Sequence, residues 1–391
     1  MPTFYNFKQD GNTHSFDDVF IPVDAFRQGN LWTWGNNNYG QLGINDTTNR
    51  STPVTTLSGG SNWKQVAGGS SHTAAIKTDG TLWTWGRADV GMIGTNDGTD
   101  RSTPVQIFAG GTNWKQVSCT DHTAAIKTDG TLWLWGYNIY GALGINETGH
   151  GTYRRTPITT LAGGSNWKQV SGGAYYTAAI KTDGTLWTWG HNANGQLGIN
   201  DTTNRATPVT TFSGGTNWKQ VSAGYGHCTA IKTDGTLWNW GRADNAQLGV
   251  NDTTQRNTPV TTFSGGTNWK QVSAGGFMTE AIKTDGTLWL WGRNAYGQLG
   301  TNGGGDRNTP VTTFAGGTNW KQVSAGYRQI SAIKTDGTLW TWGGSTYGAL
   351  GTNDATDRAT PVTTFVGGTN WKQVACGLYH TLAIEYIDPV L

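Results

Sequence analysis

The sequence predicts an all-β protein, a seven-bladed β-propeller made of four-stranded antiparallel blades. Three observations lead to this fold class. The motif Leu-Trp-x-Trp-Gly recurs seven times at intervals of 50 to 54 residues, starting at Leu31, Leu82, Leu132, Leu186, Leu237, Leu288 and Leu339. All 21 tryptophans fall on three positions of this repeat. The 59 glycines, with many Thr and Asn, are typical of short strands joined by tight turns.

Each repeat contains four short apolar or alternating runs, which we call strands A to D. Strand A carries Trp-Lys-Gln-Val, as at residues 63–66, and strand B is the apolar run that follows, as at residues 72–76. Strand C is the Leu-Trp-x-Trp-Gly motif, and strand D contains Thr-Pro-Val or Thr-Pro-Ile. Asp-Gly between strands B and C supplies the positive φ that a tight hairpin favours. Each repeat therefore predicts one antiparallel meander.

The order of strands at the two ends of the chain predicts a closed ring. The chain opens with strands C and D and ends with strands A and B, between Trp371 and Ile384. One blade should therefore combine both ends, which leaves no open edge in the ring. Since a single four-stranded sheet cannot bury apolar residues on both faces, the seven sheets should stack around an axis with the tryptophans between them. We expect one propeller domain over residues 31–391.

Residues 1–30 match no repeat except at their end, yet they hold five of the 11 phenylalanines. We interpret them as a docking or anchor segment, which would suit a component of a larger assembly. The segment resembles the leaders of phage-encoded repeat proteins of the virion or tail. The chain shows neither a signal peptide nor an 18-residue apolar stretch that could span a membrane. We expect a soluble protein, cytoplasmic or assembled into a particle.

Four submotifs recur in a fixed order: Ala-Gly-x-x-His-Thr, Asp-Gly-x-Leu-Trp-x-Trp-Gly, Tyr-Gly-Gln-Leu-Gly and Thr-Pro-Val. From about residue 23 to residue 386 they resemble the repeat of the regulator of chromosome condensation family, whose members are seven-bladed propellers. Kelch repeats have a similar period, but their paired glycines are placed differently relative to Trp. The resemblance implies three activities to consider: guanine nucleotide exchange on a small GTPase, chromatin binding and photoreception.

The residues of this chain fit those activities poorly. Exchange relies on a projecting wedge, and the repeats leave room only for a short insertion from His150 to Arg155. Chromatin binding relies on a basic tail, whereas residues 1–30 are not basic. Photoreception needs tryptophans near the A–B turn, and this chain has Tyr225 and Tyr327 there instead. A guanine nucleotide exchange factor remains the second alternative. The mode of action is most similar to that of the propeller inhibitor of β-lactamase, which engages its partner through one face of aromatic-rich loops.

Two loops differ sharply between the repeats, while the B–C and D–A turns stay nearly constant. The variable A–B turns are residues 70–72, 121–122, 174–176, 225–227, 276–278, 327–329 and 378–380. The variable openings of the C–D loops are residues 36–39, 87–90, 137–140, 191–194, 242–245, 293–296 and 344–347. In an antiparallel meander these two loops emerge at the same end of the sheet. They should therefore share one face of the propeller.

The variable face is the predicted binding surface, because with the insertion of residues 150–155 it carries 11 of the 13 tyrosines, among Arg, Asn, Ser and Gly. Tyr and Arg give large contacts at a low entropy cost, and loops on a rigid scaffold often carry binding. The predicted partner-binding residues are Arg87, Tyr137, Tyr175, Tyr176, Tyr225, Arg242, Phe277, Met278, Arg293, Tyr327, Arg328 and Tyr379. We expect a non-enzymatic propeller that binds a protein or a glycan.

Two other interpretations stay open for this face. Tyr39, Tyr140, Tyr296 and Tyr347 precede Gly-x-Leu-Gly and could be scaffold residues. Neutral drift could also diversify solvent-facing turns, and the contacts of the protein would then run through residues 1–30 and the rim of an assembly.

Composition and motifs exclude several classes of function. The formal net charge of +2 gives no reason to expect nucleic acid or an acidic membrane as a partner. The constant face gathers 13 lysines against six turn aspartates, which we interpret as a solvated rim. Three cysteines are too few for a disulfide framework. The short Asn/Asp loops, such as that around Asp46, more often bind their own backbone than a metal ion. The repeat position that holds His in four copies also holds Tyr, Met and Gln, which a metal site would not tolerate. We expect no catalytic residues and no cofactor.

Overall fold

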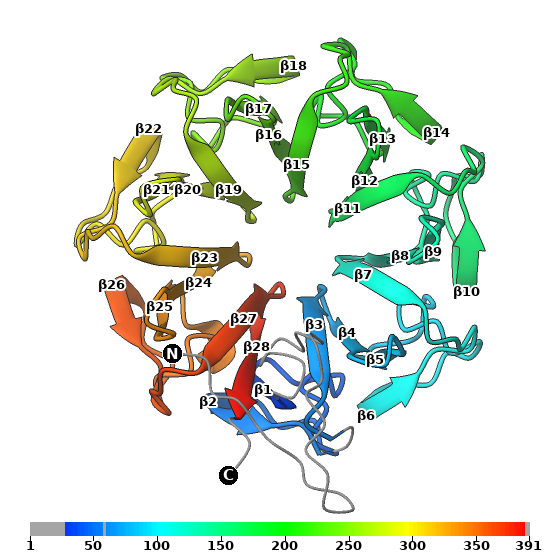
Figure 1. The fold of residues 1–391 in the computed structure, drawn as a ribbon, viewed down its shortest axis with the longest axis horizontal. Coiled ribbons are helices and arrows are strands. Elements are labelled where there is room, and N and C mark those ends of the chain that lie inside the picture. Colours follow the sequence, from blue (N-terminus) through cyan, green and yellow to red (C-terminus); the bar gives the residue numbers. More distant parts are fainter. Residues whose placement is uncertain (1–27, 58–59, 388–391) are drawn as a thin grey trace, which may run out of the picture.

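A computed structural model describes residues 28–57 and 60–387 as a ring of seven four-stranded sheets around a central axis (Figure 1). The fold class is therefore confirmed. Most of the predicted anchor segment, residues 1–27, lies outside the described residues. Residues 28–30 belong to the first strand, so the repeat begins earlier than the sequence suggested.

The chain enters at β1 (Gln28–Gly35) and β2 (Arg50–Thr55), and six continuous blades follow. The first three are β3 (Trp63–Gly68), β4 (His72–Lys77), β5 (Leu82–Gly86) and β6 (Arg101–Gln106); β7 (Trp114–Cys119), β8 (His122–Lys127), β9 (Leu132–Tyr137) and β10 (Tyr153–Thr159); and β11 (Trp167–Gly173), β12 (Tyr176–Lys181), β13 (Leu186–Gly190) and β14 (Arg205–Thr210). The next three are β15 (Trp218–Ala223), β16 (His227–Lys232), β17 (Leu237–Gly241) and β18 (Arg256–Thr261); β19 (Trp269–Ala274), β20 (Met278–Lys283), β21 (Leu288–Gly292) and β22 (Arg307–Thr312); and β23 (Trp320–Ala325), β24 (Gln329–Lys334), β25 (Leu339–Gly343) and β26 (Arg358–Thr363).

The seventh blade closes the ring as expected. Its strands β27 (Trp371–Cys376) and β28 (His380–Ile387) join β1 and β2 in the order β2-β1-β28-β27. Strand β1 pairs with β28 over eight residue pairs, from Gln28 opposite Ile387 to Gly35 opposite His380. The two ends of the chain thus share one sheet, and the ring has no open edge.

The innermost strands are joined to one another by a ring of glutamines. The Gln65 side chain donates a hydrogen bond to the Val117 carbonyl and accepts one from the Val117 amide, both at 3.2 Å. Gln116, Gln169, Gln220, Gln271, Gln322 and Gln373 repeat this pair of bonds to the next blade. The Gln of the Trp-Lys-Gln-Val motif therefore replaces the missing sheet partner of each inner strand.

Between the sheets lie seven apolar clusters that contain the tryptophans. One of them packs Ile180 and Leu186 of one blade against Trp218, Val221 and Trp240 of the next. Each cluster depends on two neighbouring sheets, so burial of the tryptophans requires the ring.

A second ring of contacts starts at the first residue of each B strand. His72 contacts the Thr123 hydroxyl of the next blade through Nε2 at 2.7 Å, and His122, His227 and His380 make the same contact with Thr177, Thr279 and Thr73. The Thr123 hydroxyl itself donates to the Met92 carbonyl, so its oxygen accepts from a histidine that carries its proton on Nε2. These histidines are scaffold contacts between blades.

A candidate binding face

The A–B turns and C–D loops lie on one face, as the strand order predicted. Tyr137 and Tyr140, at the end of β9 and in the loop after it, both contact Tyr175 in the β11–β12 turn, at ring centroid distances of 5.6 and 5.7 Å. The Arg328 guanidinium of the β23–β24 turn lies 4.2 Å from the ring centroid of Tyr296 in the β21–β22 loop. The two variable loops therefore form a continuous surface, which we call the loop face.

Five aromatic residues form an arc across four neighbouring blades of the loop face. Tyr225, Phe277 and Tyr327 contact one another at centroid distances of 5.2 to 6.0 Å. Tyr379 contacts Tyr327 at 5.5 Å and Tyr347 at 5.7 Å. Tyr225 and Tyr347, at the two ends of this aromatic arc, are each 42% exposed. The exposed tyrosines of the arc therefore offer ring faces and hydroxyl groups to a partner, whereas Phe277, a predicted partner-binding residue, is buried.

The predicted arginines are held over aromatic rings. Arg242 and Arg293 lie 5.2 and 5.6 Å from the ring centroid of Phe277, and this covering leaves the Phe277 ring buried. Asp244 accepts two hydrogen bonds from Arg242 and raises its pKa. Such stacked and paired guanidinium groups are already ordered, so they lose little freedom on binding.

Arg87 lies on the opposite side of the loop face. Its guanidinium donates to Asp89 at 2.6 Å and lies 5.1 Å from the ring centroid of Tyr39. Like Arg242, Arg87 pairs with an aspartate and lies over an aromatic ring, but its ring, that of Tyr39, is exposed.

A second aromatic group surrounds Tyr175. The negative charge of Asp121 and partial burial raise the pKa of Tyr175 to about 12, so its hydroxyl stays a hydrogen-bond donor. Burial also raises the pKa of Asp121. Tyr175 has a left-handed backbone with φ of 63°, a region that costs non-glycine residues roughly 1 kcal/mol or more. A tyrosine is therefore kept at this turn despite local strain.

Tyr176 and Met278 correct the predicted set, because both are fully buried and cannot contact a partner. Each is the first residue of a B strand, the position of His72 in β4. The Tyr176 hydroxyl donates to the His227 carbonyl of the next blade at 2.5 Å. Strand β12 begins at Tyr176, whose side chain faces the neighbouring sheet, whereas Tyr175 precedes the strand in a turn with a left-handed backbone.

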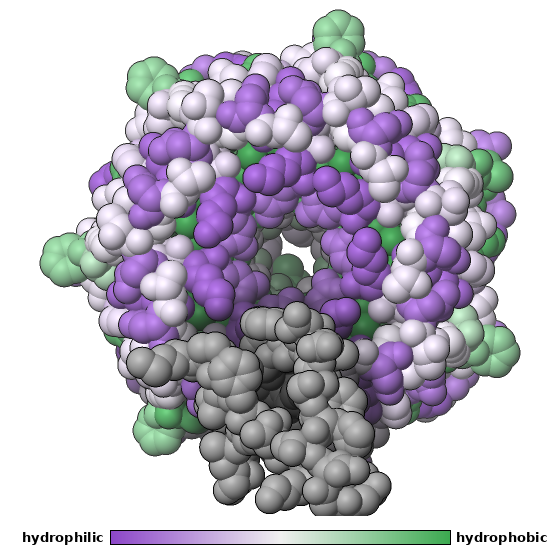
Figure 2. Space-filling model, in the orientation of Figure 1, coloured by the Kyte–Doolittle hydropathy of each residue, from purple (hydrophilic) through white to green (hydrophobic). Residues whose placement is uncertain are grey.

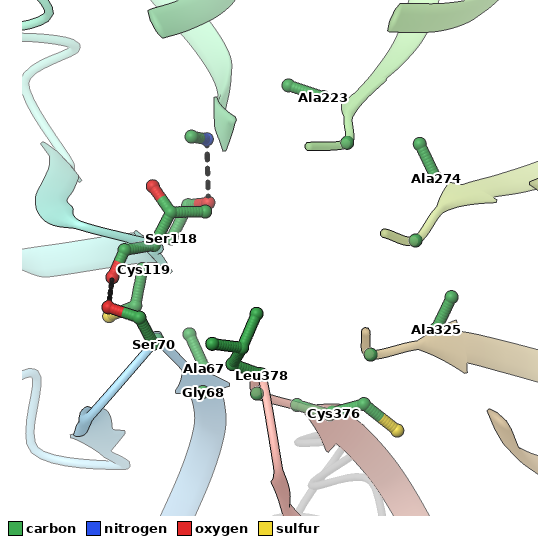
Figure 3. Close-up of a pocket in the computed structure, with 18 of the residues that line it drawn as sticks. Ala67, Gly68, Ser70, Ser118, Cys119, Ala223, Ala274, Ala325, Cys376 and Leu378 are labelled. Atoms are coloured by element: carbon green, nitrogen blue, oxygen red, sulfur yellow. Dashed lines mark hydrogen bonds between the residues drawn. The ribbon is translucent and has the colours of Figure 1, made fainter. Parts of the chain in front are cut away.

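A hollow of about 370 Å³ opens at the centre of the loop face. Its walls are the ends of the seven inner strands and the A–B turns, mostly Gly, Ala and Ser, with Tyr175, Tyr225 and Tyr327 among the lining residues. Figure 3 shows Ala223, Ala274 and Ala325 on one side, Ser118 and Cys119 on the other, and Leu378 reaching in between them. We call this cavity the central hollow. It has room for one or two side chains of a partner.

The described residues of the central hollow provide binding groups rather than an activated nucleophile. Burial raises the pKa of the Cys119 thiol to about 12 and that of the Cys376 thiol to about 11, so both stay protonated near neutral pH. Within residues 28–57 and 60–387, no group of three or more His, Cys, Asp and Glu side chains is placed to hold a metal ion.

The Asn/Asp loops bind their own chain. Asp46 accepts hydrogen bonds from the Thr48 amide and from Arg50, and Arg101, Arg205, Arg256 and Arg358 pair in the same way with Asp97, Asp201, Asp252 and Asp354. These arginines are therefore paired within their own blades.

Sequence reasoning missed several residues of this face. Tyr140 and Tyr347, for which the sequence left a scaffold role open, contact Tyr175 and Tyr379. Sequence reasoning also missed Asp121 and Leu378. The only available signal was their place in the variable loops, because their neighbours lie on the next blade.

The ring of seven blades and its loop face define a repeat propeller with one varied surface on an otherwise regular scaffold. The chain belongs to the regulator of chromosome condensation (RCC1) repeat family. The model of the RCC1-like domain matches residues 116–388, and the model of the single RCC1 repeat matches residues 28–76 and 79–126.

Curated relatives and solved structures agree with this family. The ultraviolet-B receptor UVR8 of Arabidopsis thaliana is 33% identical over 328 residues, which cover 82% of this chain and 74% of that protein. The probable E3 ubiquitin-protein ligase HERC4 of Mus musculus is 33% identical over 340 residues, which cover 84% of this chain but only 32% of the ligase.

Two solved structures show the same fold at low identity. Human WBSCR16 has a TM-score of 0.80 with 22% identity and covers 92% of this chain and 99% of its own. Prp20p of Saccharomyces cerevisiae has a TM-score of 0.79 with 20% identity and covers 95% of this chain and 96% of its own.

Proposed function

We propose that this chain is a non-enzymatic binding propeller that recognises a protein through its loop face, with a glycan as the alternative ligand. The observation that carries the proposal is the aromatic arc, which runs from Tyr225 to Tyr347 beside the central hollow. Partly exposed tyrosines next to a hollow are typical of surfaces that bind other molecules.

The composition of this surface favours a selected contact over drift. Tyr175 keeps a large side chain at a strained backbone position, and Arg242 and Arg328 are ordered by stacking. Random change in solvent-facing turns gives no reason for aromatic residues of four blades to meet.

The geometry suggests how a partner would bind. One of its side chains would enter the central hollow, where the Tyr175 hydroxyl can donate a hydrogen bond. The flanking segments of the partner would stack on Tyr225 and Tyr327. The yeast structure Prp20p is described with its binding to Gsp1p and to histones, and yeast RCC1 with bound Kap60, so protein ligands are known for similar propellers.

Nucleotide exchange is less well supported for this chain. The longest variable loop follows β9, and it is hardly longer than its equivalents, because β9 (Leu132–Tyr137) and β10 (Tyr153–Thr159) are each lengthened by one residue instead of leaving a projecting wedge. Acceleration of nucleotide release from a small GTPase would reverse this ranking.

The test compares two surfaces of the full chain. Immobilised wild type and Tyr225→Ser/Tyr327→Ser are used to capture proteins from the native source and are probed on a glycan array. The control is Phe212→Ser/Phe314→Ser, which changes exposed residues of the other face. We expect one ligand that the wild type and the control retain and the tyrosine variant loses. Equal capture by all three would contradict the proposal.

A further inference from the structure

The face opposite the loop face carries one exposed apolar side chain on every blade. These residues are Leu57, Phe108, Leu161, Phe212, Phe263, Phe314 and Phe365, which we call the apolar rim. Each is between 62% and 69% exposed. Figure 2 views this face and shows apolar side chains that project from its outer edge. Their exposure means that packing of the fold does not explain them.

The backbone holds each of these side chains in place. The Phe212 amide donates to the Gly198 carbonyl at 2.8 Å, and the other six rim residues make the same bond to the equivalent glycine of their own blade. The turns that carry them have the form Thr-Thr-Phe-Ser-Gly-Gly, as at residues 261–266, and contain no charged residue. Each rim residue therefore presents an exposed apolar side chain from an uncharged turn whose backbone is held by a hydrogen bond.

The same face gathers the lysines of the described chain. Seven exposed lysines stand at the start of the inner strands, namely Lys64, Lys115, Lys168, Lys219, Lys270, Lys321 and Lys372. Six more end the B strands, namely Lys77, Lys127, Lys181, Lys232, Lys283 and Lys334. Their acidic neighbours on this face are the six turn aspartates from Asp79 to Asp336 and Glu385. The face is thus clearly basic, whereas 12 arginines accompany 12 acidic residues on the loop side, apart from the buried Glu280.

The inner lysines surround the central axis on this face. A hollow of about 390 Å³ there is lined by Lys64, Lys321 and Lys372 together with glutamines of the inner ring. The outer lysines are held over tryptophan rings, as Lys77 is over Trp83 at 4.2 Å. Lysines therefore surround the middle of this face. Figure 2 shows hydrophilic side chains there and apolar side chains at the edge.

We propose that this lysine face docks on an anionic lipid surface. The lysines would attract acidic headgroups, and the apolar rim would enter the boundary between headgroups and acyl chains. Within the described residues no helix is long and apolar enough to cross a membrane, so the contact would be peripheral.

Two other occupants fit less well. A second copy of this chain would bring two strongly basic faces together, which repel each other. A globular acidic protein would bury a compact patch, whereas the rim residues are separated from one another around the whole disc. A fluid bilayer accepts each side chain independently and matches the charge.

The experiment is a flotation assay of the full chain with vesicles of phosphatidylcholine and phosphatidylserine in a molar ratio of about 7:3. The rim variant is Phe212→Ser/Phe263→Ser/Phe314→Ser/Phe365→Ser, and the charge variant is Lys219→Gln/Lys270→Gln/Lys321→Gln. Tyr225→Ser/Tyr327→Ser on the loop face is the matched control. Gel filtration and thermal melting verify that each variant is folded.

We expect the wild type and the control to float with the acidic vesicles and not with pure phosphatidylcholine. Both variants should bind roughly tenfold more weakly or worse, because each loses several groups that act on the bilayer. Absence of wild-type binding, equal binding to neutral vesicles, or full binding by the folded rim variant would each overturn the proposal. The proposal would also be overturned if the protein bound soluble polyglutamate as tightly as it binds vesicles and if the rim variant bound polyglutamate as well as the wild type does.

Discussion

The four buried histidines between the blades predict that the propeller loses stability in mild acid. His72, His122, His227 and His380 are fully buried, and Nε2 of each contacts a threonine hydroxyl of the next blade. Burial lowers the pKa of His72 and His227 to about 3 and that of His122 and His380 to about 4. Protonation at Nδ1 would place a charge in the interior, and in His72, His227 and His380 this atom has no partner.

The sign and size follow from these pKa values. Above pH 6.5 the histidines are neutral in both the folded and the unfolded chain and do not affect the pH dependence. Below pH 6.5 only the unfolded chain binds protons, so stability falls until the pH reaches the folded pKa values. Each histidine then contributes a slope of about 1.4 kcal/mol per pH unit. Between pH 7 and pH 5 the four together remove about 7 kcal/mol, which is comparable to the whole stability of many domains.

The assay measures urea unfolding at pH 7, 6 and 5 for the wild type and for His72→Gln/His122→Gln/His227→Gln/His380→Gln. Glutamine is a suitable replacement, because Gln329 holds the same position in β24 and donates to the Gly377 carbonyl at 3.0 Å. The lowered carboxylate pKa values of Asp46 and similar residues act mainly below pH 5 and are the same in both proteins.

We expect the free energy of unfolding of the wild type to fall steeply between pH 7 and pH 5 and that of the variant to fall much less. A variant of the exposed His150, His150→Gln, should behave as the wild type. Parallel curves for the wild type and the fourfold variant would refute the role of the histidine ring.

Three further predictions concern the scaffold. Gln220→Ala leaves the amide and carbonyl of Val272 without partners, so it should lower the free energy of unfolding, measured in urea titrations, by about 2 kcal/mol. The control Arg205→Ala removes a half-exposed ion pair and should lower the same free energy by about 1 kcal/mol or less. Glu280 is fully buried, has no partner on either carboxylate oxygen and has a strongly raised pKa, so its own contribution to stability falls as pH rises above the ordinary glutamate range, opposite in sign to that of the histidines; Glu280→Leu, with the residue type of Leu382 in the same repeat position, should therefore exceed the wild type in stability by a margin that grows with pH, and should have the higher melting temperature at pH 7. Tyr175→Gly should relieve the left-handed strain, stabilise the fold by up to about 1 kcal/mol in thermal melts and weaken ligand binding; a less stable Tyr175→Gly protein would contradict the strain argument.

The fold could be predicted because Gly, Pro and Asp-Gly mark the ends of each strand, and because the seven copies reveal the order of strands at both chain ends. The glutamine ring could not be predicted in this way. Gln65 bonds to Val117, one blade away, and a single repeat contains no sign of that contact. Contacts within a blade follow from local sequence, whereas contacts between blades depend on the radius and twist of the ring.

The sequence predicted the location of the loop face better than it predicted which of its residues are exposed. Strand order was sufficient to place both loops on one side. The error at Tyr176 and Met278 arose because the boundary between a turn and a strand decides whether a side chain faces the surface or the next sheet, and sequence locates such boundaries only approximately.

Net charge hides how the charges are arranged. A total of +2 suggested no charged partner, yet the described lysines lie on one face and the described arginines on the other. The two cations suit different contacts: Arg242 stacks on Phe277 and pairs with Asp244, while Lys64 and its equivalents remain exposed around the central axis. Because the two faces are opposite, a lipid surface on the lysine face would leave the aromatic arc turned toward solvent. Loss of one contact by substitution should therefore leave the other intact, which makes each set of variants the control for the other.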